Sequence, residues 1–84
     1  MDLKEQFEAA SVNSKSLPEQ SNDNLLLLYS LFKQGTEGDC SIEKPTNMFD
    51  FKGIAKYNAW ENLRGLSKEA AMQQYIDLVK QLAV

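Results

Sequence analysis

Residues 23–34 read Asp-Asn-Leu-Leu-Leu-Leu-Tyr-Ser-Leu-Phe-Lys-Gln, and this stretch decides the expected fold. A helix through it would carry leucines over most of its circumference, which is typical of a deeply buried helix. Helix-capping residues occupy positions 21–24, around the start of the stretch, and Gly35, Thr36 and Gly38 follow it as stop signals. We therefore expect a second helix over residues 23–34 that is the most buried element of the fold.

Helical spacing of apolar residues predicts three more helices around this one. The first covers residues 3–14 and ends before Leu17-Pro18, because the residue before a proline avoids helical geometry. The third covers 51–63 and the fourth 68–82, with Asp50 and Ser67 as their N-caps. The fourth carries an apolar stripe of Met72, Tyr75, Ile76, Val79 and Leu82.

The connections between these helices favour a helical bundle. No segment shows the alternation of a strand, and residues 37–49 form a long loop between the second and third helices. A connection of that length does not require its two helices to be antiparallel neighbours. The sequence therefore predicts an all-α, four-helix bundle with one long loop, formed by residues 1–84 as a single domain.

The composition excludes several classes of function. The chain has 84 residues and a net charge of −3, which disfavours a general nucleic-acid binder. It has no histidine, so it can form neither a Ser-His-Asp triad nor a histidine metal site. The single cysteine, Cys40, follows Asp39, and a neighbouring carboxylate disfavours a reactive thiolate. We expect a protein that is not an enzyme and that uses no metal and no cofactor.

The sequence also predicts where the protein works. Its first residues do not form a signal peptide, and its longest apolar run, at 25–28, is too short to span a bilayer. We expect a cytoplasmic monomer without stable membrane insertion.

Lysines and aromatic residues recur at helical spacing. Tyr29 and Lys33 are four residues apart and share a helix face, as do Lys52 and Lys56. Like charges at that spacing cost a helix about 0.2–0.5 kcal/mol, unless an anion between them neutralises the repulsion. A nearby aromatic ring would suit an anion that also carries a flat group. Spacing alone leaves a simpler interpretation open, in which the lysines are solvated and the tyrosines, Tyr75 included, belong to the core.

Three stretches of the chain resemble the acyl-CoA-binding protein family. Residues 28–39 read Leu-Tyr-Ser-Leu-Phe-Lys-Gln-Gly-Thr-Glu-Gly-Asp, and residues 51–60 read Phe-Lys-Gly-Ile-Ala-Lys-Tyr-Asn-Ala-Trp. The likeness continues through Gly-Leu-Ser-Lys-Glu-Ala-Ala-Met at 65–72 to Tyr75-Ile76. Phe7 together with Ala9-Ala10 fits the family's first helix. It covers nearly the whole chain in order, which is far more specific than one short motif.

The resemblance implies an up-down-down-up bundle and a ligand site. Tyr29 and Lys33 would hold the 3′-phosphate of adenosine, Lys56 would complete that phosphate site, and Lys52 would assist one turn earlier. Tyr75 would lie near the nucleotide, with Trp60 mainly in the core. Lys15 matches a ligand-contacting lysine near the end of the first helix, and Ser30, Leu31 and Phe32 lie in the stretch expected to line the site.

The implied function is non-enzymatic binding, buffering and intracellular transport of medium- to long-chain acyl-CoA thioesters. Phe32 stands where many members of the family have tyrosine, so its ring can stack but a phenolic hydrogen bond is lost. This leaves an alternative, a helical protein-interaction module that has kept the fold and lost strong acyl-CoA binding. A thioesterase is a further alternative, and the absence of histidine speaks against it.

Overall fold

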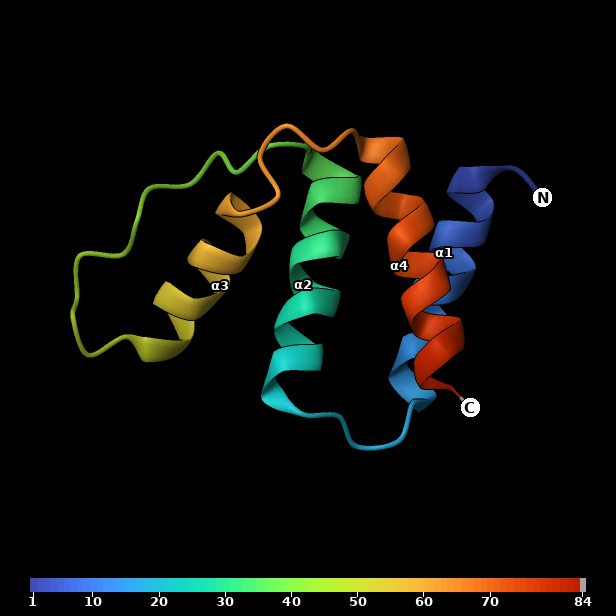
Figure 1. Ribbon diagram of the computed structural model, residues 1–84, viewed down its shortest axis with the longest axis horizontal. Helices are drawn as coiled ribbons and strands as arrows, with labels where there is room; N and C mark the ends of the chain where they lie inside the picture. The colour runs from blue at the N-terminus through green and yellow to red at the C-terminus, as the bar shows by residue number, and fades with distance from the viewer. Residues whose placement is uncertain (84) are drawn as a thin grey trace.

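This computed structural model describes residues 1–83, which contain four α-helices and one 3₁₀ turn (Figure 1). The elements are α1 (Leu3–Asn13), η1 (Ser14–Ser16), α2 (Asn22–Glu37), α3 (Phe51–Glu61) and α4 (Lys68–Leu82). Residues 1–83 contain no strand, so the all-α prediction is confirmed. Figure 1 shows α2 and α3 running in the same direction, opposite to α1 and α4, which confirms the up-down-down-up order.

Each helix begins at a side chain that accepts a hydrogen bond from a backbone N–H of the first turn. Such a cap satisfies a donor that has no partner inside the helix, and it contributes about 1 kcal/mol. The capping residues are Asp2 for α1, Ser21 for α2, Asp50 for α3 and Ser67 for α4. The two caps predicted for the third and fourth helices are therefore confirmed.

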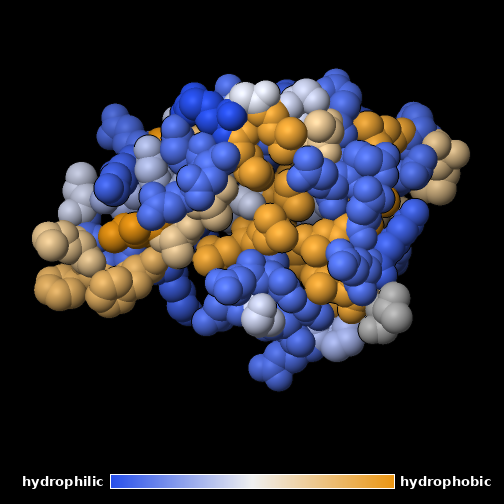
Figure 2. Space-filling view, in the orientation of Figure 1, coloured by the Kyte–Doolittle hydropathy of each residue, from blue (hydrophilic) through white to orange (hydrophobic). Residues whose placement is uncertain are grey.

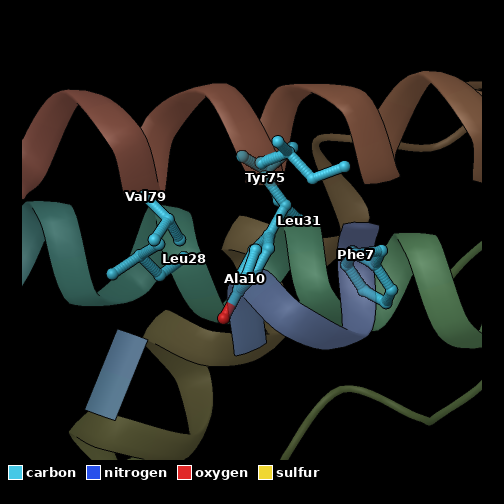
Figure 3. Close-up of a cluster of buried hydrophobic side chains, with 7 residues drawn as sticks. Phe7, Ala10, Leu28, Leu31, Tyr75 and Val79 are labelled. Atoms are coloured by element: carbon cyan, nitrogen blue, oxygen red, sulfur yellow. The ribbon is translucent and has the colours of Figure 1, made fainter. Parts of the chain in front are cut away.

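The hydrophobic core lies among α1, α2 and α4. Helix α4 packs against both α1 and α2, whereas α3 packs mainly against α2 and stands to one side of the bundle (Figure 1). Figure 3 shows core side chains of α1, α2 and α4 pointing toward one another. The buried cluster comprises Phe7, Ala10, Leu28, Leu31, Tyr75, Ile76 and Val79, with Met72 and Leu82 half-buried against it.

The predicted end of the second helix is wrong by one turn. Helix α2 continues through Gly35 and Thr36 to Glu37, and its C-cap is Gly38, whose φ of 83° suits glycine. Gly35 is a close-contact residue, because a Cβ there would lie 3.1 Å from a ring carbon of Phe7 and 3.2 Å from Cγ of Met72. The absence of a side chain at Gly35 thus lets α1 and α4 approach the α2 backbone.

The expected burial of α2 is also only partly right. Leu28 and Leu31 belong to the core, but Leu25 is 52% exposed and Leu27 is 43% exposed. Periodicity could not separate these leucines, since four in a row occupy every side of a helix. The first turns of α2 therefore present apolar surface to solvent.

A network of hydrogen bonds joins the end of α2 to the turn before α4. The fully buried Gln34 amide donates from Nε2 to Oδ1 of Asp39 (2.9 Å) and to the carbonyl oxygen of Leu66 (2.8 Å). The backbone N–H of Gly65 donates to the same Asp39 oxygen at 2.8 Å. The Gly65 and Gln34 bonds stabilise the carboxylate and hold the pKa of Asp39 below its ordinary value of 3.8. We call Gln34, Asp39, Gly65 and Leu66 the polar clasp.

Two side chains near the C-terminal end of α3 extend this connection. Trp60 is fully buried, as expected of a core residue, and its Nε1 donates to the Gly38 carbonyl oxygen at 2.9 Å. Arg64 donates to the Cys40 carbonyl oxygen at 2.9 Å and pairs with Glu61. The C-terminal end of α3 is thereby fixed to the chain that leaves α2.

We predict that Gln34→Ala destabilises the protein by about 2–3 kcal/mol, because two hydrogen bonds are lost and the carbonyl of the half-buried Leu66 is left without its side-chain donor. Urea denaturation followed by circular dichroism measures this. Gln73→Ala is the matched control, since Gln73 is exposed and bonds only to Asp77 on its own helix. Its effect should stay within about 0.5 kcal/mol. Equal effects in the two variants would contradict the role of the clasp.

Candidate functional site

Two lysines and two aromatic rings form reciprocal contacts between α2 and α3. The Lys56 ammonium of α3 lies over the Tyr29 ring of α2, 5.3 Å from its centroid. The Lys33 ammonium of α2 lies over the Trp60 ring of α3, 5.1 Å from its centroid. Each helix supplies one lysine and one ring, so we call these the crossed pairs. These pairs can form because α2 and α3 are parallel. The step from Tyr29 to Lys33 and the step from Lys56 to Trp60 then both advance about 6 Å in the same direction.

Lys33 also has an acidic partner one turn along α2. Its ammonium pairs with the Glu37 carboxylate, and its side chain is 29% exposed. The hydrogen bond to Glu37 raises the pKa of Lys33 above its ordinary value of 10.5, so the cation is retained at neutral pH. Any anion that binds Lys33 must compete with Glu37.

The lysines of α3 have no such competitor. Among residues 1–83, ion pairs form at Lys33 and at Arg64, and none forms at Lys52 or Lys56. Lys52 lies one turn before Lys56, and both are exposed. Their mutual repulsion, worth about 0.2–0.5 kcal/mol, therefore remains, and an anion between them would relieve it.

An aromatic cluster lies on the α1 and α4 side of α2. The Phe32 ring stacks on Phe7 with centroids 5.4 Å apart, and both rings meet the edge of Tyr75, at 5.8 and 5.2 Å. Tyr75 and Phe7 are each 4% exposed, whereas Phe32 is 36% exposed. Phe32 is thus the member of the cluster that a flat ligand group could reach.

An exposed ridge of α2 connects the aromatic cluster to the crossed pairs. Leu25, Tyr29 and Phe32 follow the i, i+4, i+7 spacing that places side chains on one helix face. Tyr29 is half-buried beneath Lys56, and Leu25 and Phe32 are exposed. Figure 2 shows that apolar side chains also reach the surface elsewhere, over the middle of the face turned toward the viewer. The ridge face of α2 therefore offers cations on one flank and apolar surface beside them.

The structure brings together only part of the predicted set of site residues. Tyr29, Lys33 and Lys56 lie in the crossed pairs, with Lys52 one turn away. Leu31 is 2% exposed and lies in the core, and Ser30 is 1% exposed and donates to the Leu27 carbonyl oxygen of its own helix. Lys15 is exposed on η1, where no contact among residues 1–83 joins it to the crossed pairs.

Sequence reasoning missed three partners of these residues. The pairing of Glu37 with Lys33 was readable from its i, i+4 spacing. The positions of Trp60 under Lys33 and of Phe7 under Phe32 were not, because each joins helices far apart in sequence.

Two surface hollows lie elsewhere, between α1 and the C-terminal half of α4. Both are lined by Asn13, Val79 and Lys80 among others, and neither includes a residue of the crossed pairs. They carry no cluster of cations, so the α2 and α3 face remains the candidate site.

Residues 4–79 match the profile of the family described as Acyl CoA binding protein. The chain belongs to the acyl-CoA-binding protein family. It is 49% identical to acyl-CoA-binding protein homolog 1 of Caenorhabditis elegans over 77 residues, which cover 90% of this chain and 88% of the relative. It is also 49% identical to the acyl-CoA-binding protein of Dictyostelium discoideum over 78 residues, which cover 92% of each chain.

Solved structures of the family share its fold. The crystal structure of Oryza sativa acyl-CoA-binding protein 2 superposes with a TM-score of 0.92 at 44% identity, covering 96% of this chain and 90% of that one. An acyl-CoA-binding protein from Moniliophthora perniciosa gives a TM-score of 0.87 at 37% identity, covering 98% of this chain and 80% of that one. Within residues 1–83, no helix has both the length and the apolar character needed to cross a membrane.

Proposed function

We propose that this protein binds medium- to long-chain acyl-CoA thioesters, and that it buffers and carries them without making or breaking a bond. The main support for the proposal is the crossed pairs, which place cations from two helices beside exposed apolar surface. An acyl-CoA has the matching chemistry, with phosphates, a flat base and a long apolar chain. Membership of the family supports the same ligand.

The cations would hold the phosphates of the ligand. Lys33 and Lys56 each offer an ammonium that a phosphate oxygen can accept from, and Lys52 adds a third charge one turn away. A charge-assisted hydrogen bond is worth about 1.5–3 kcal/mol, but binding at Lys33 also requires its separation from Glu37. Lys56 should therefore contribute more net affinity than Lys33.

The apolar ridge of α2 would hold the rest of the ligand. Phe32 offers the adenine an exposed ring that its stack on Phe7 already orients. Leu25 offers the acyl chain an aliphatic surface that is 52% exposed. Each methylene removed from water contributes about 0.8 kcal/mol before the ordering of the chain is counted. Lys15 would join the site only if the ligand reaches η1.

The proposed setting is the cytoplasm and the proposed form is a monomer consisting of one domain. The free thiol of Cys40, which is 6% exposed, is compatible with a reducing compartment.

We predict that Lys33→Ala and Lys56→Ala each weaken palmitoyl-CoA binding by roughly 10- to 100-fold, with the larger loss in Lys56→Ala, since each removes one charge-assisted bond and only Lys33 must first leave Glu37. Calorimetric titration measures the affinities, and thermal unfolding checks that both variants remain folded. Lys80→Ala is the control, because Lys80 is an exposed lysine of α4 outside the site. Wild-type affinity in both site variants would remove the phosphate assignment.

We also predict that affinity rises steeply with acyl-chain length. Octanoyl-CoA and palmitoyl-CoA differ by eight methylenes, or about 6 kcal/mol gross, of which ordering of the chain offsets about half. The remainder corresponds to roughly two orders of magnitude in affinity. Calorimetry with free CoA, octanoyl-CoA and palmitoyl-CoA gives the comparison, and an assay for free thiol in the same samples detects hydrolysis. Equal affinities would refute burial of the chain, and released thiol would refute a purely binding function.

A further inference from the structure

Three large apolar side chains protrude where the long loop meets α3. Met48 is 80% exposed, Phe49 is 83% exposed and Phe51 is 72% exposed, the highest values among large apolar residues after the N-terminal methionine is set aside. We call these three residues the apolar tip. Figure 2 shows apolar side chains gathered at the end of the molecule where Figure 1 places the loop and the start of α3.

A hydrogen-bonded turn holds the tip in position. The Asp50 backbone N–H donates to the Asn47 carbonyl oxygen at 3.1 Å, so Met48 and Phe49 occupy the two central positions of the turn. The Asn47 side chain also accepts from the Phe49 backbone N–H at 2.9 Å. Central turn positions usually carry Gly, Asn, Asp or Ser. Two large apolar side chains at the apex of a fixed turn therefore indicate a partner, since the turn itself gains nothing from them.

The size and shape of the tip decide between kinds of partner. Two phenylalanines and a methionine at these exposures present roughly 400 Å² of surface. A stable protein interface needs about 800 Å² from each partner, with matching shape. The tip is convex and too small for that, whereas a lipid surface adapts its shape to any apolar protrusion. We propose that the apolar tip docks this protein reversibly onto the surface of a phospholipid bilayer.

The charges around the tip are compatible with this docking. Residues 43–54 around the tip carry Lys44 and Lys52 against Glu43 and Asp50, so this stretch is neutral although the chain has a net charge of −3. The Asp50 carboxylate accepts from the Gly53 N–H as the cap of α3, which offsets part of its charge. The two lysines make no ion pair within residues 1–83 and can reach lipid phosphates. The tip is thus a part of the surface that can approach a bilayer without net repulsion.

Docking through the tip would also orient the candidate site. Phe51 directly precedes Lys52, and Lys56 follows one turn later on α3. The lysine-bearing flank would then lie near the headgroup layer, from which an amphiphilic ligand with a long acyl chain can leave or enter. The docking itself does not depend on acyl-CoA binding.

The test is flotation of the ligand-free protein with phosphatidylcholine vesicles, in low salt and in 0.5 M salt. We expect the wild-type protein to float with the vesicles at both salt concentrations. Met48→Ser combined with Phe49→Ser should reduce the bound fraction by more than tenfold. Val12→Ser, which alters an apolar residue that is 64% exposed on α1, is the matched control and should bind as the wild type does. Palmitoyl-CoA titration of each variant shows whether acyl-CoA binding changes independently of vesicle binding.

Each of the other results would overturn the proposal. Absence of wild-type flotation, or flotation lost in 0.5 M salt, would exclude docking by apolar contact. Equal flotation of the double variant would exclude the tip, and equal loss in Val12→Ser would show non-specific adhesion. If sedimentation velocity shows wild-type self-association that the double variant abolishes, the occupant is a second copy of the chain. If the double variant loses palmitoyl-CoA affinity and keeps flotation, the tip covers the acyl chain instead.

Discussion

The two hydrogen bonds that the buried Gln34 amide donates are the contacts on which the rest of the structure depends. They join the end of α2 to Asp39, where the long loop begins, and to Leu66, just before α4. Helix α3 lies between those two points in sequence and packs mainly on α2, so its position is set at its C-terminal end, by the clasp and by the bond from Trp60 to Gly38. Lys56 and Trp60 come to lie beside Tyr29 and Lys33 because that end is fixed.

Two electrostatic effects of opposite sign would act on the proposed ligand. The chain has a net charge of −3, and its proposed ligand is a polyanion, so repulsion at long range must be overcome by attraction from nearby lysines. Glu37 neutralises Lys33 in the free protein, which stabilises the free protein and reduces the net free energy that a phosphate gains by binding Lys33. Lys52 and Lys56 repel each other in the free protein, and a phosphate would relieve that repulsion. Much of the affinity must then come from the apolar part of the ligand.

Local signals predicted the elements of the fold well. The caps at Asp50 and Ser67 and the stripe of α4 depend on residues close in sequence. The errors came from contacts between helices. Gly35 was interpreted as a stop signal, although it is the residue at which Phe7 and Met72 approach α2.

The candidate site likewise contains residues that local spacing predicts and residues that are placed by contacts between helices. The spacing of Tyr29 with Lys33, and of Lys52 with Lys56, singled out three of the four crossed-pair residues. The family resemblance implied that they serve one phosphate site. No pattern in α2 could show that Ser30 is bonded to its own helix, or that Trp60 lies beneath Lys33. The position of Trp60 depends on how α3 is held, which in turn depends on Gln34, a glutamine that resembles any other polar residue of a helix.

The most direct test of this account is the palmitoyl-CoA affinity of Gln34→Ala, measured by calorimetry at a temperature where circular dichroism shows the variant to be folded. Gln34 is fully buried and touches none of the four crossed-pair side chains through its hydrogen bonds. If the clasp positions α3, the affinity should fall by about tenfold, equivalent to 1.4 kcal/mol, while Gln73→Ala binds as the wild type does. Unchanged affinity in a folded Gln34→Ala protein would contradict the account, because the lysines would then converge without the clasp.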